Sequence, residues 1–229
     1  AFDGARGYFP QGKAELAGNP TRAGLLNMSE KTIAAPAFSL DAGRPVVLIT
    51  GGSQGAQKIN EALLLSLVEL TKKFQVIHQS GVENYNEVNA QILNIVNEGG
   101  GGYGKTISDN YRLYPNFNLE QMALAYSAAD VVVSRSGAAS IFEVAAIGKP
   151  VVMIPLKGSA SDHQLANARE FGKYGAIVVE EDNLTPHILI NEIENAYENR
   201  TALSEKLKQF AKPDAARIIA EKILADLSQ

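Results

Sequence analysis

A glycine-rich turn between a strand and a helix is the feature that most constrains the fold of this chain. Residues 45–49 (PVVLI) form an apolar run typical of a buried parallel strand, and residues 50–56 (TGGSQGA) follow it. Beyond the turn, Ile59, Leu63 and Leu67 recur at helical spacing. Glycines let the backbone approach a ligand, and a helix N-terminus carries partial positive charge, so this arrangement favours binding of a phosphate. A tight turn without a ligand is the alternative, and this turn alone leaves both open.

A second turn of small residues follows another apolar strand. Residues 134–140 (SRSGAAS) open a helix that we expect over residues 138–147. Glu143 lies about one and a half turns into this helix, since 3.6 residues make a turn. A carboxylate there can accept hydrogen bonds from both hydroxyls of a ribose. An acid that only stabilises the start of the helix is the alternative, and the pattern leaves both interpretations open.

A third loop, residues 155–164, precedes a helix that carries two amide side chains. Gln164 and Asn167 are three residues apart and therefore share one helix face. Side-chain amides offer donors and acceptors, which suits sugar hydroxyls. The alternative is a helix capped by Ser161 or Asp162, with exposed amides behind the cap.

Strands and helices alternate from residue 45 onward, which predicts an α/β fold with a Rossmann-like, doubly wound parallel sheet. In such sheets ligands bind beyond the carboxyl ends of the strands. The expected strands are 45–50, 74–79, 111–114, 130–134, 150–154 and 176–179. The expected helices are 54–72, 83–97, 119–128, 138–147, 162–174, 185–198, 201–210 and 213–227.

The composition excludes several classes of protein. The chain has 229 residues, 45% of them hydrophobic, which suffices for a packed α/β core. A net charge of −4 argues against a nucleic-acid-binding role. Because there is no cysteine, disulfides and cysteine–zinc sites are excluded, and three scattered histidines argue against a histidine metal site. No metal or other cofactor is therefore expected.

The N-terminal part of the chain differs from the rest. Residues 1–44 are rich in glycine and proline and begin without methionine, so we interpret them as the end of a preceding domain and a linker. No apolar run approaches 18 residues, and there is no signal-peptide pattern, so a cytoplasmic location is expected. Residues 45–212 are predicted to form the main domain and residues 213–229 a C-terminal helix.

Several short motifs together resemble the C-terminal half of the MurG family. They are GNPTR at 18–22, GGSQGA at 51–56, HQSG at 78–81, SAADVVVSRSGAAS with a following glutamate at 127–143, GKPVVMIP at 148–155, DHQLANA at 162–168 and PDAA at 213–216. The MurG family transfers N-acetylglucosamine from its UDP donor to a lipid-linked muramyl-peptide in peptidoglycan synthesis. It has the GT-B architecture, two Rossmann-like domains with the active site between them. The resemblance implies that this chain is the donor-binding half.

The resemblance also implies roles for individual residues. Ser53, Gln54 and Gly55 would hold the diphosphate, which Arg22 would also reach. Leu119 would meet the uracil through its backbone, Arg135 would restrict the base pocket, and Glu143 would take the ribose. The start of the helix at Ala138, Ala139 and Ser140 would face the α-phosphate, and Gln164 and Asn167 would contact the sugar. His163 stands where some members have glutamine and is not assigned as a base.

The resemblance also implies which functional parts belong to the N-terminal half of the family. The family's acceptor site, its apolar membrane patch and its general base belong to the N-terminal half, so no catalytic residue is assigned in this chain. We expect the chain alone to bind its donor without turnover. The full-length protein would be peripheral at the inner face of the cell membrane, with a nucleotide sugar and a lipid-linked acceptor as its partners.

Other interpretations of the function remain open. An NAD-dependent dehydrogenase would need a third glycine in the first turn and an acid after the second strand, where residues 78–80 read HQS. Another UDP-sugar enzyme of the GT-B type or a UDP-N-acetylglucosamine 2-epimerase would share the two-domain plan. A donor-binding subunit that joins a separate acceptor subunit is the last alternative.

Overall fold

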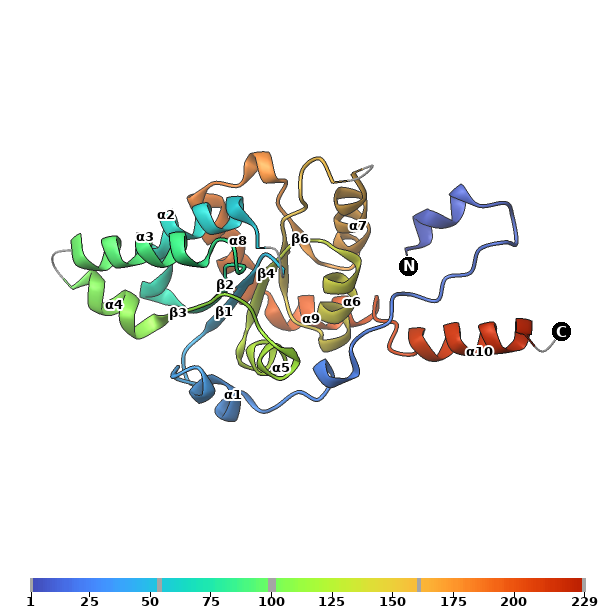
Figure 1. The fold of residues 1–229 in the computed structure, drawn as a ribbon, viewed down its shortest axis with the longest axis horizontal. Helices are drawn as coiled ribbons and strands as arrows, with labels where there is room; N and C mark the ends of the chain where they lie inside the picture. Colours follow the sequence, from blue (N-terminus) through green and yellow to red (C-terminus); the bar gives the residue numbers. More distant parts are fainter. Residues whose placement is uncertain (1, 53–54, 99–101, 160–161, 228–229) are drawn as a thin grey trace.

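The chain forms one parallel β-sheet covered by helices on both faces (Figure 1). The computed structural model describes residues 2–52, 55–98, 102–159 and 162–227. Within these residues the sheet has six strands in the order β3-β2-β1-β4-β5-β6, all parallel. The strands are β1 (Val46–Thr50), β2 (Gln75–Gln79), β3 (Tyr111–Tyr114), β4 (Val131–Ser134), β5 (Val151–Met153) and β6 (Ile177–Val178). The predicted doubly wound Rossmann-like sheet is confirmed.

The helices divide between the two faces of the sheet. One face carries α2 (Gln57–Lys73), α3 (Tyr85–Glu98), α4 (Tyr103–Asn110) and α8 (Pro186–Glu198). The other carries α1 (Lys31–Ala37), α5 (Leu119–Ala128), α6 (Ala138–Ile147), α7 (His163–Gly172) and α9 (Arg200–Lys208). The helix α10 (Ala215–Leu227) extends away from the sheet (Figure 1). Short 3₁₀ helices are η1 (Asp3–Tyr8), η2 (Ala23–Leu25) and η4 (Glu181–Asn183).

Alternation along the strands sends side chains into two cores, one on each face. In β1, Val46 and Leu48 belong to the core beneath α5 and α6, whereas Val47 and Ile49 belong to the core beneath α2 and α8. All four are fully buried. Burial of each such side chain contributes about 1.5–3 kcal/mol, so the apolar strands hold both helical layers.

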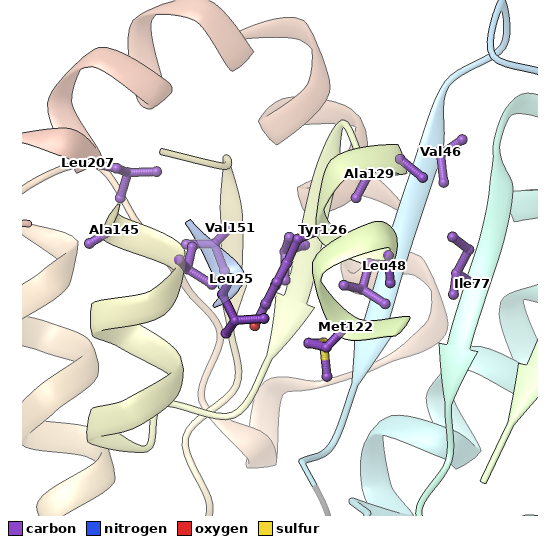
Figure 2. Close-up of a cluster of buried hydrophobic side chains, with 14 of the residues drawn as sticks. Leu25, Val46, Leu48, Ile77, Met122, Tyr126, Ala129, Ala145, Val151 and Leu207 are labelled. Carbon is purple, nitrogen blue, oxygen red and sulfur yellow. The ribbon is translucent and has the colours of Figure 1, made fainter. Parts of the chain in front are cut away.

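Part of the segment expected to be a linker packs into the main core. Leu25, Ala34 and Ala35 are fully buried, and Figure 2 shows Leu25 in one cluster with Leu48 and Tyr126. This stretch therefore packs against the domain that follows it. The helix α1 is short and contains a proline, so it gives no periodic signal in the sequence. The helix α4 was missed for a similar reason, because it has only eight residues.

The first residues also dock on the domain. The ring of Phe2 lies 5.4 Å from that of Phe142 and 5.9 Å from that of Phe210, measured between centroids. Glu15 pairs with Lys222 of α10 at 2.5 Å. Among the described residues, no helix combines the length and the apolar character needed to cross a membrane.

Candidate functional site

The sheet order places the two glycine turns side by side. The strand order reverses between β1 and β4, whose last residues, Thr50 and Ser134, are direct partners in the sheet. In doubly wound sheets this switch point, at the carboxyl ends of the strands, opens a crevice for ligands. Turns that are far apart in the sequence thus meet at one edge of the sheet.

The first turn needs its glycines. Gly52 and Gly55 have φ angles of 80° and 77°, in the left-handed region. A Cβ atom on Gly55 would lie 2.3 Å from the carbonyl oxygen of Ser80, so a side chain has no room there. The turn therefore packs directly against the end of β2. The predicted phosphate-binding residues Ser53 and Gln54 lie outside the described residues, and α2 begins at Gln57, three residues later than predicted.

Two adjoining pockets, each of about 500 Å³, open at this edge. The first, called the Glu143 pocket, is lined by Pro20, Arg22, Thr50, Gly52, Gln79, Asn116, Phe117, Met122, Tyr126, Ala139, Ser140 and Glu143. The second, called the Arg135 pocket, is lined by Gly51, Gly52, Gly55, Ala56, Gln57, Lys58, Arg135, Gly137, Ser140, Leu156, Gln164 and Glu181. Gly52 and Ser140 line both pockets, so the glycine turn and the start of α6 form their common boundary. Their size suits a ligand of several linked parts.

Arg22 and Glu143 form a two-pronged ion pair in the Glu143 pocket. Arg22 Nε lies 2.8 Å from Glu143 Oε1, and Nη2 lies 3.1 Å from Oε2. The glutamate side chain is 7% exposed, whereas that of the arginine is 51% exposed. The hydrogen bond to Glu143 raises the pKa of Arg22, and burial partly opposes this. Glu143 thus has a partner that is distant in the sequence. An acid that only stabilised the start of its own helix would not need such a partner.

The start of α6 lies between the pockets. Gly137 is its N-cap and carries no side chain, and in the described part of the chain no other side chain caps this end. The backbone N–H groups of Ala138, Ala139 and Ser140 therefore remain available to an anion. Ser140 and Ala139 lie in the pocket walls, whereas Ala138 lines neither pocket.

Arg135 is held by a largely buried partner, Glu181, which the sequence analysis did not predict. Its Nη2 lies 2.6 Å from Glu181 Oε1, and the two side chains are only 11% and 12% exposed. Arg135 Nη1 also donates to the carbonyl of Ile154 at 3.2 Å, and Glu181 Oε2 accepts from the backbone N–H of Lys157 at 3.2 Å. The pair thus joins the end of β4 to the loop after β5. No local pattern marks Glu181, because its partner is distant in the sequence.

The two predicted amides lie on α7 but face different pockets. Gln164 lines the Arg135 pocket, and its Oε1 accepts from the backbone N–H of Leu156 at 3.1 Å. Asn167 instead lines a neighbouring pocket together with Phe2 and Tyr8. Of the two caps considered for α7, Ser161 lies outside the described residues, and Asp162 makes no capping hydrogen bond.

Leu119 is not among the residues that line the Glu143 pocket. It is the first residue of α5, which Asn118 and Gln121 cap reciprocally. Its side chain packs on the backbone of Gly24, where an added Cβ would be 2.9 Å from Leu119 Cδ2. Tyr126, further along α5, is buried in the pocket wall, and burial, with a smaller effect of Glu143, raises the pKa of its hydroxyl.

A buried histidine lies beneath the site. His78 Nδ1 lies 2.6 Å from the hydroxyl of Tyr111, and Nε2 lies 2.9 Å from Oδ1 of Asn60. Burial lowers the pKa of His78 to about 3, so the ring is neutral and bonds within the core. Within the described ranges, no group of three or more His, Asp or Glu side chains is placed to hold a metal ion.

Comparisons with known proteins agree with this geometry. A family model described as the glycosyltransferase family 28 C-terminal domain matches residues 46–221. A relative from Bacteroides thetaiotaomicron is 34% identical over 230 residues. Its name is UDP-N-acetylglucosamine--N-acetylmuramyl-(pentapeptide) pyrophosphoryl-undecaprenol N-acetylglucosamine transferase. The alignment covers 98% of this chain and 59% of the relative, so the chain spans about three fifths of that protein.

Solved structures also include a member of the MurG family among those similar to this chain. The crystal structure of MurG from Acinetobacter baumannii aligns with a TM-score of 0.71 at 27% identity, covering 95% of this chain and 58% of that one. A UDP-GlcNAc 2-epimerase from Neisseria meningitidis aligns with a TM-score of 0.56 at 18% identity, covering 85% and 49%, which is a likeness of fold alone. The resemblance carried by the sequence motifs is confirmed.

Proposed function

Because the chain belongs to the glycosyltransferase family 28 C-terminal domain family, we propose that it is the donor-binding half of an inverting glycosyltransferase. The donor would be UDP-N-acetylglucosamine, and the acceptor a lipid-linked muramyl-peptide of peptidoglycan synthesis. The observation that carries the proposal is the meeting of two glycine turns at the β1–β4 switch point, with Glu143 beside them. This arrangement suits a ligand with a diphosphate and a ribose.

The Glu143 pocket would hold the nucleoside. A carboxylate has about four lone-pair sites, and Arg22 occupies two of them. The remaining sites can accept hydrogen bonds from the two ribose hydroxyls. The base would lie toward the start of α5, where the resemblance gives the backbone of Leu119 a contact with uracil.

The diphosphate would lie where the two pockets join. Arg22 uses Nε and Nη2 for Glu143, and no bond of its Nη1 is present in the described part of the chain. This group can reach a phosphate while the ion pair persists. The N–H groups at the start of α6 supply further donors. The roles of Ser53, Gln54 and Gly55 in holding the phosphates remain part of the proposal.

The Arg135 pocket would take the sugar. Gln164 accepts a hydrogen bond through Oε1, which leaves its Nε2 group for a sugar hydroxyl. Asn167 faces the neighbouring pocket, so its sugar contact rests on the resemblance alone. The Arg135–Glu181 pair fixes one wall of this pocket. Arg135 does not line the Glu143 pocket, so its proposed role of restricting the base rests on the resemblance alone.

The chemistry divides between this half and the rest of the protein. Inverting transfer needs a base on the acceptor hydroxyl and stabilisation of the UDP leaving group. This chain supplies the second requirement, through Arg22 and the start of α6. We assign no base to it, and propose that acceptor and base belong to the remaining part. Since Arg22 and the helix supply positive potential, we propose that no divalent metal is needed.

The location and domain limits follow from the same proposal. An acceptor linked to a lipid requires the whole protein to work at the membrane surface, and we propose the cytoplasmic face. Residues 45–212 would form the donor domain, residues 1–44 the end of the preceding domain and the linker, and residues 213–229 a C-terminal helix.

Calorimetry with UDP, UDP-N-acetylglucosamine, ADP and NAD tests the proposal. We expect both uridine ligands to bind more tightly than ADP or NAD, because the pockets are proposed to match a uridine diphosphate. NAD binding as tight as UDP binding would overturn the glycosyltransferase function and favour a dehydrogenase domain.

A further inference from the structure

A buried histidine is connected by hydrogen bonds to the first glycine turn. His78 Nε2 lies 2.9 Å from Asn60 Oδ1, and Asn60 Nδ2 donates to the carbonyl oxygen of Ser80 at 3.1 Å. His78 and Ser80 are fully buried and Asn60 is 3% exposed, so these bonds are shielded from water. Gly55 rests on the same carbonyl, because a Cβ atom built on it would lie 2.3 Å from that oxygen. A side chain in the core is thus linked to the backbone of the turn.

The direction of these bonds is fixed by the carbonyl of Ser80. A carbonyl oxygen can only accept, so Asn60 must turn its amino group toward Ser80 and its oxygen toward His78. The opposite orientation of the amide would place two oxygens face to face, with no hydrogen between them. His78 must therefore carry its proton on Nε2 and donate it to Asn60. Because the ring is neutral, its Nδ1 is the acceptor for the hydroxyl of Tyr111 at 2.6 Å.

Asn60 lies at the start of α2, where the helix leaves the first turn. It is the fourth residue of the helix, and its backbone N–H closes the first helical turn on the carbonyl of Ala56 at 2.9 Å. Its side chain fastens the same helical turn to Ser80, directly after β2. Gln57 and Lys58, which precede it in the helix, line the Arg135 pocket. The side chain of Asn60 therefore holds this helix start, and the pocket wall with it, against the end of β2.

The start of α2 also carries backbone donors that the helix does not use. In the described part of the chain no side chain caps it at Ala56, so the N–H groups of Gln57 and Lys58 have no partner within the helix. They are available to an anion, as at other helix starts. Hydrogen bonds weaken steeply when the donor is misaligned, so the contact of α2 with β2 affects how well these groups bind a phosphate.

We propose that His78 and Asn60 are positioning residues for phosphate binding by the first turn. Neither lines the Glu143 pocket or the Arg135 pocket. His78 orients the amide of Asn60, and Asn60 holds the start of α2 against Ser80. The inference rests on the proposed function, since it requires a nucleoside diphosphate at this turn. Loss of either side chain should weaken the binding of the diphosphate and leave the binding of the nucleoside as it was.

The ratio of UDP to uridine affinity is the direct test, because only UDP carries phosphates. Calorimetry measures UDP binding, and displacement of uridine by UDP measures the weaker ligand. His78→Leu removes the donor that orients Asn60, and Asn60→Ala removes the bond to Ser80. We expect each variant to lose about tenfold in UDP affinity, the equivalent of one hydrogen bond, with the uridine affinity unchanged.

A conservative variant and a control separate positioning from stability. In His78→Gln the amino group can donate to Asn60 while the oxygen accepts from Tyr111, so the ratio should stay close to that of the wild type. Thr71→Val is the matched control, because Thr71 is fully buried near the other end of α2 and donates to the carbonyl of Leu67 at 2.8 Å. It should lower the melting temperature and leave the ratio unchanged. Thermal melting is measured for every variant.

NMR of the wild-type chain gives a test that needs no variant. The imidazole of His78 should be the Nε2–H tautomer. UDP should shift the side-chain amide resonances of Asn60, whereas uridine should not. An Nδ1–H tautomer, or an Asn60 amide that responds equally to both ligands, would contradict the positioning role. This result decides the question if neither His78→Leu nor Asn60→Ala folds.

Two binding results would overturn the inference, and they differ. If the wild type binds UDP more tightly than uridine, but neither His78→Leu nor Asn60→Ala lowers the ratio, the positioning role is wrong and the proposed function stands. If the wild type binds UDP no more tightly than uridine, the first turn holds no phosphate. Both the proposed function and this inference then fail.

Discussion

Arg22 and Glu143 meet through two parallel N–H···O contacts of 2.8 and 3.1 Å, although 121 residues separate them. Arg22 belongs to the N-terminal segment and Glu143 to the centre of α6. The pair therefore joins that segment to the donor site at the point where the ribose is proposed to bind. A ligand that contacts Arg22 or Glu143 therefore also affects the ion pair that joins them.

Replacing Glu143 with Ala should weaken UDP binding. The change removes a charge-assisted acceptor for the ribose and frees Arg22, so affinity should fall by about 10- to 150-fold. Calorimetry measures the loss. Thermal stability should change little, because the arginine partner is half exposed and can be hydrated. Normal UDP affinity together with a large fall in melting temperature would make Glu143 a structural residue.

Replacing Gly55 with Ala should destabilise the fold. The new Cβ would lie 2.3 Å from the Ser80 carbonyl, at a φ angle of 77° that alanine rarely adopts. Such backbone strain costs about 1–3 kcal/mol in the free energy of unfolding. Urea denaturation measures this energy. Gly137→Ala is the control, because its φ of −62° and the open space around it accept a methyl group. Equal stability of the two variants would contradict the packing of the first turn.

Removing Glu181 should cost far more than removing its exposed neighbour. Glu181→Ala leaves the largely buried Arg135 without its charge partner, which should reduce the free energy of unfolding by about 3 kcal/mol. Asp182→Ala breaks the Lys157–Asp182 pair, in which both side chains are 67% exposed, and should cost about 0–1 kcal/mol. Denaturation of both variants makes the comparison. Similar costs would show that the Arg135–Glu181 pair contributes no more than a surface contact.

The stability of the fold should decrease as the pH is lowered, because of His78. Its pKa is lowered from 6.5 to about 3, so below pH 6.5 the unfolded chain takes up a proton that the folded one refuses. The contribution of neutral His78 to the free energy of unfolding is complete above about pH 6.5. It declines as the pH is lowered to about 3, with roughly 2 kcal/mol lost between pH 7.5 and 5. Urea denaturation across this range measures the decline. His187→Gln, at an exposed position, is the control and should keep it.

NMR titration of the imidazole checks the same prediction without a variant. The ring of His78 should stay neutral at pH 5, since it bonds to Tyr111 and Asn60 in the core. Protonation of His78 near pH 6.5 in the folded protein would contradict the buried, neutral histidine.

The chain alone should transfer no sugar to a lipid-linked muramyl-peptide. Transfer requires donor and acceptor on opposite walls of one cleft, with a base at the acceptor. Radiolabelled UDP-N-acetylglucosamine would detect turnover. Adding the remaining part of a relative in trans should restore some activity, because a linker only raises the effective concentration. Steady turnover by this chain alone would place the base and the acceptor site within it.

Local sequence patterns predicted the bounds of an element well where the element is strongly apolar. Helices α5 and α6 begin and end at the predicted residues. Asn118 caps the start of α5, and Gly137 and Gly148 bound α6. Glu143 could be placed near the glycine turns for the same reason. The family resemblance then supplied the residue roles, which geometry alone does not name.

Contacts between distant residues were not predictable. Neither Glu181 beside Arg135 nor Asn116 beside Gln79 follows from any spacing, since each pair forms only when the strands assemble. Asn167 shares the helix face of Gln164, yet lines the pocket that Phe2 and Tyr8 complete. Helix α1 is stabilised by burial of Ala34 and Ala35, a tertiary effect that its own composition does not show.

The pairing of β1 with β4 also has a consequence for folding. Thr50 and Ser134 lie far apart in the sequence, so the ligand crevice is built from contacts of long sequence separation. Such contacts form slowly, because a long loop must close first. A partly folded chain therefore has no crevice to fill, and a nucleotide stabilises only the completed sheet. Nucleotide binding thus reports that the whole domain has folded, and should slow its global unfolding and degradation.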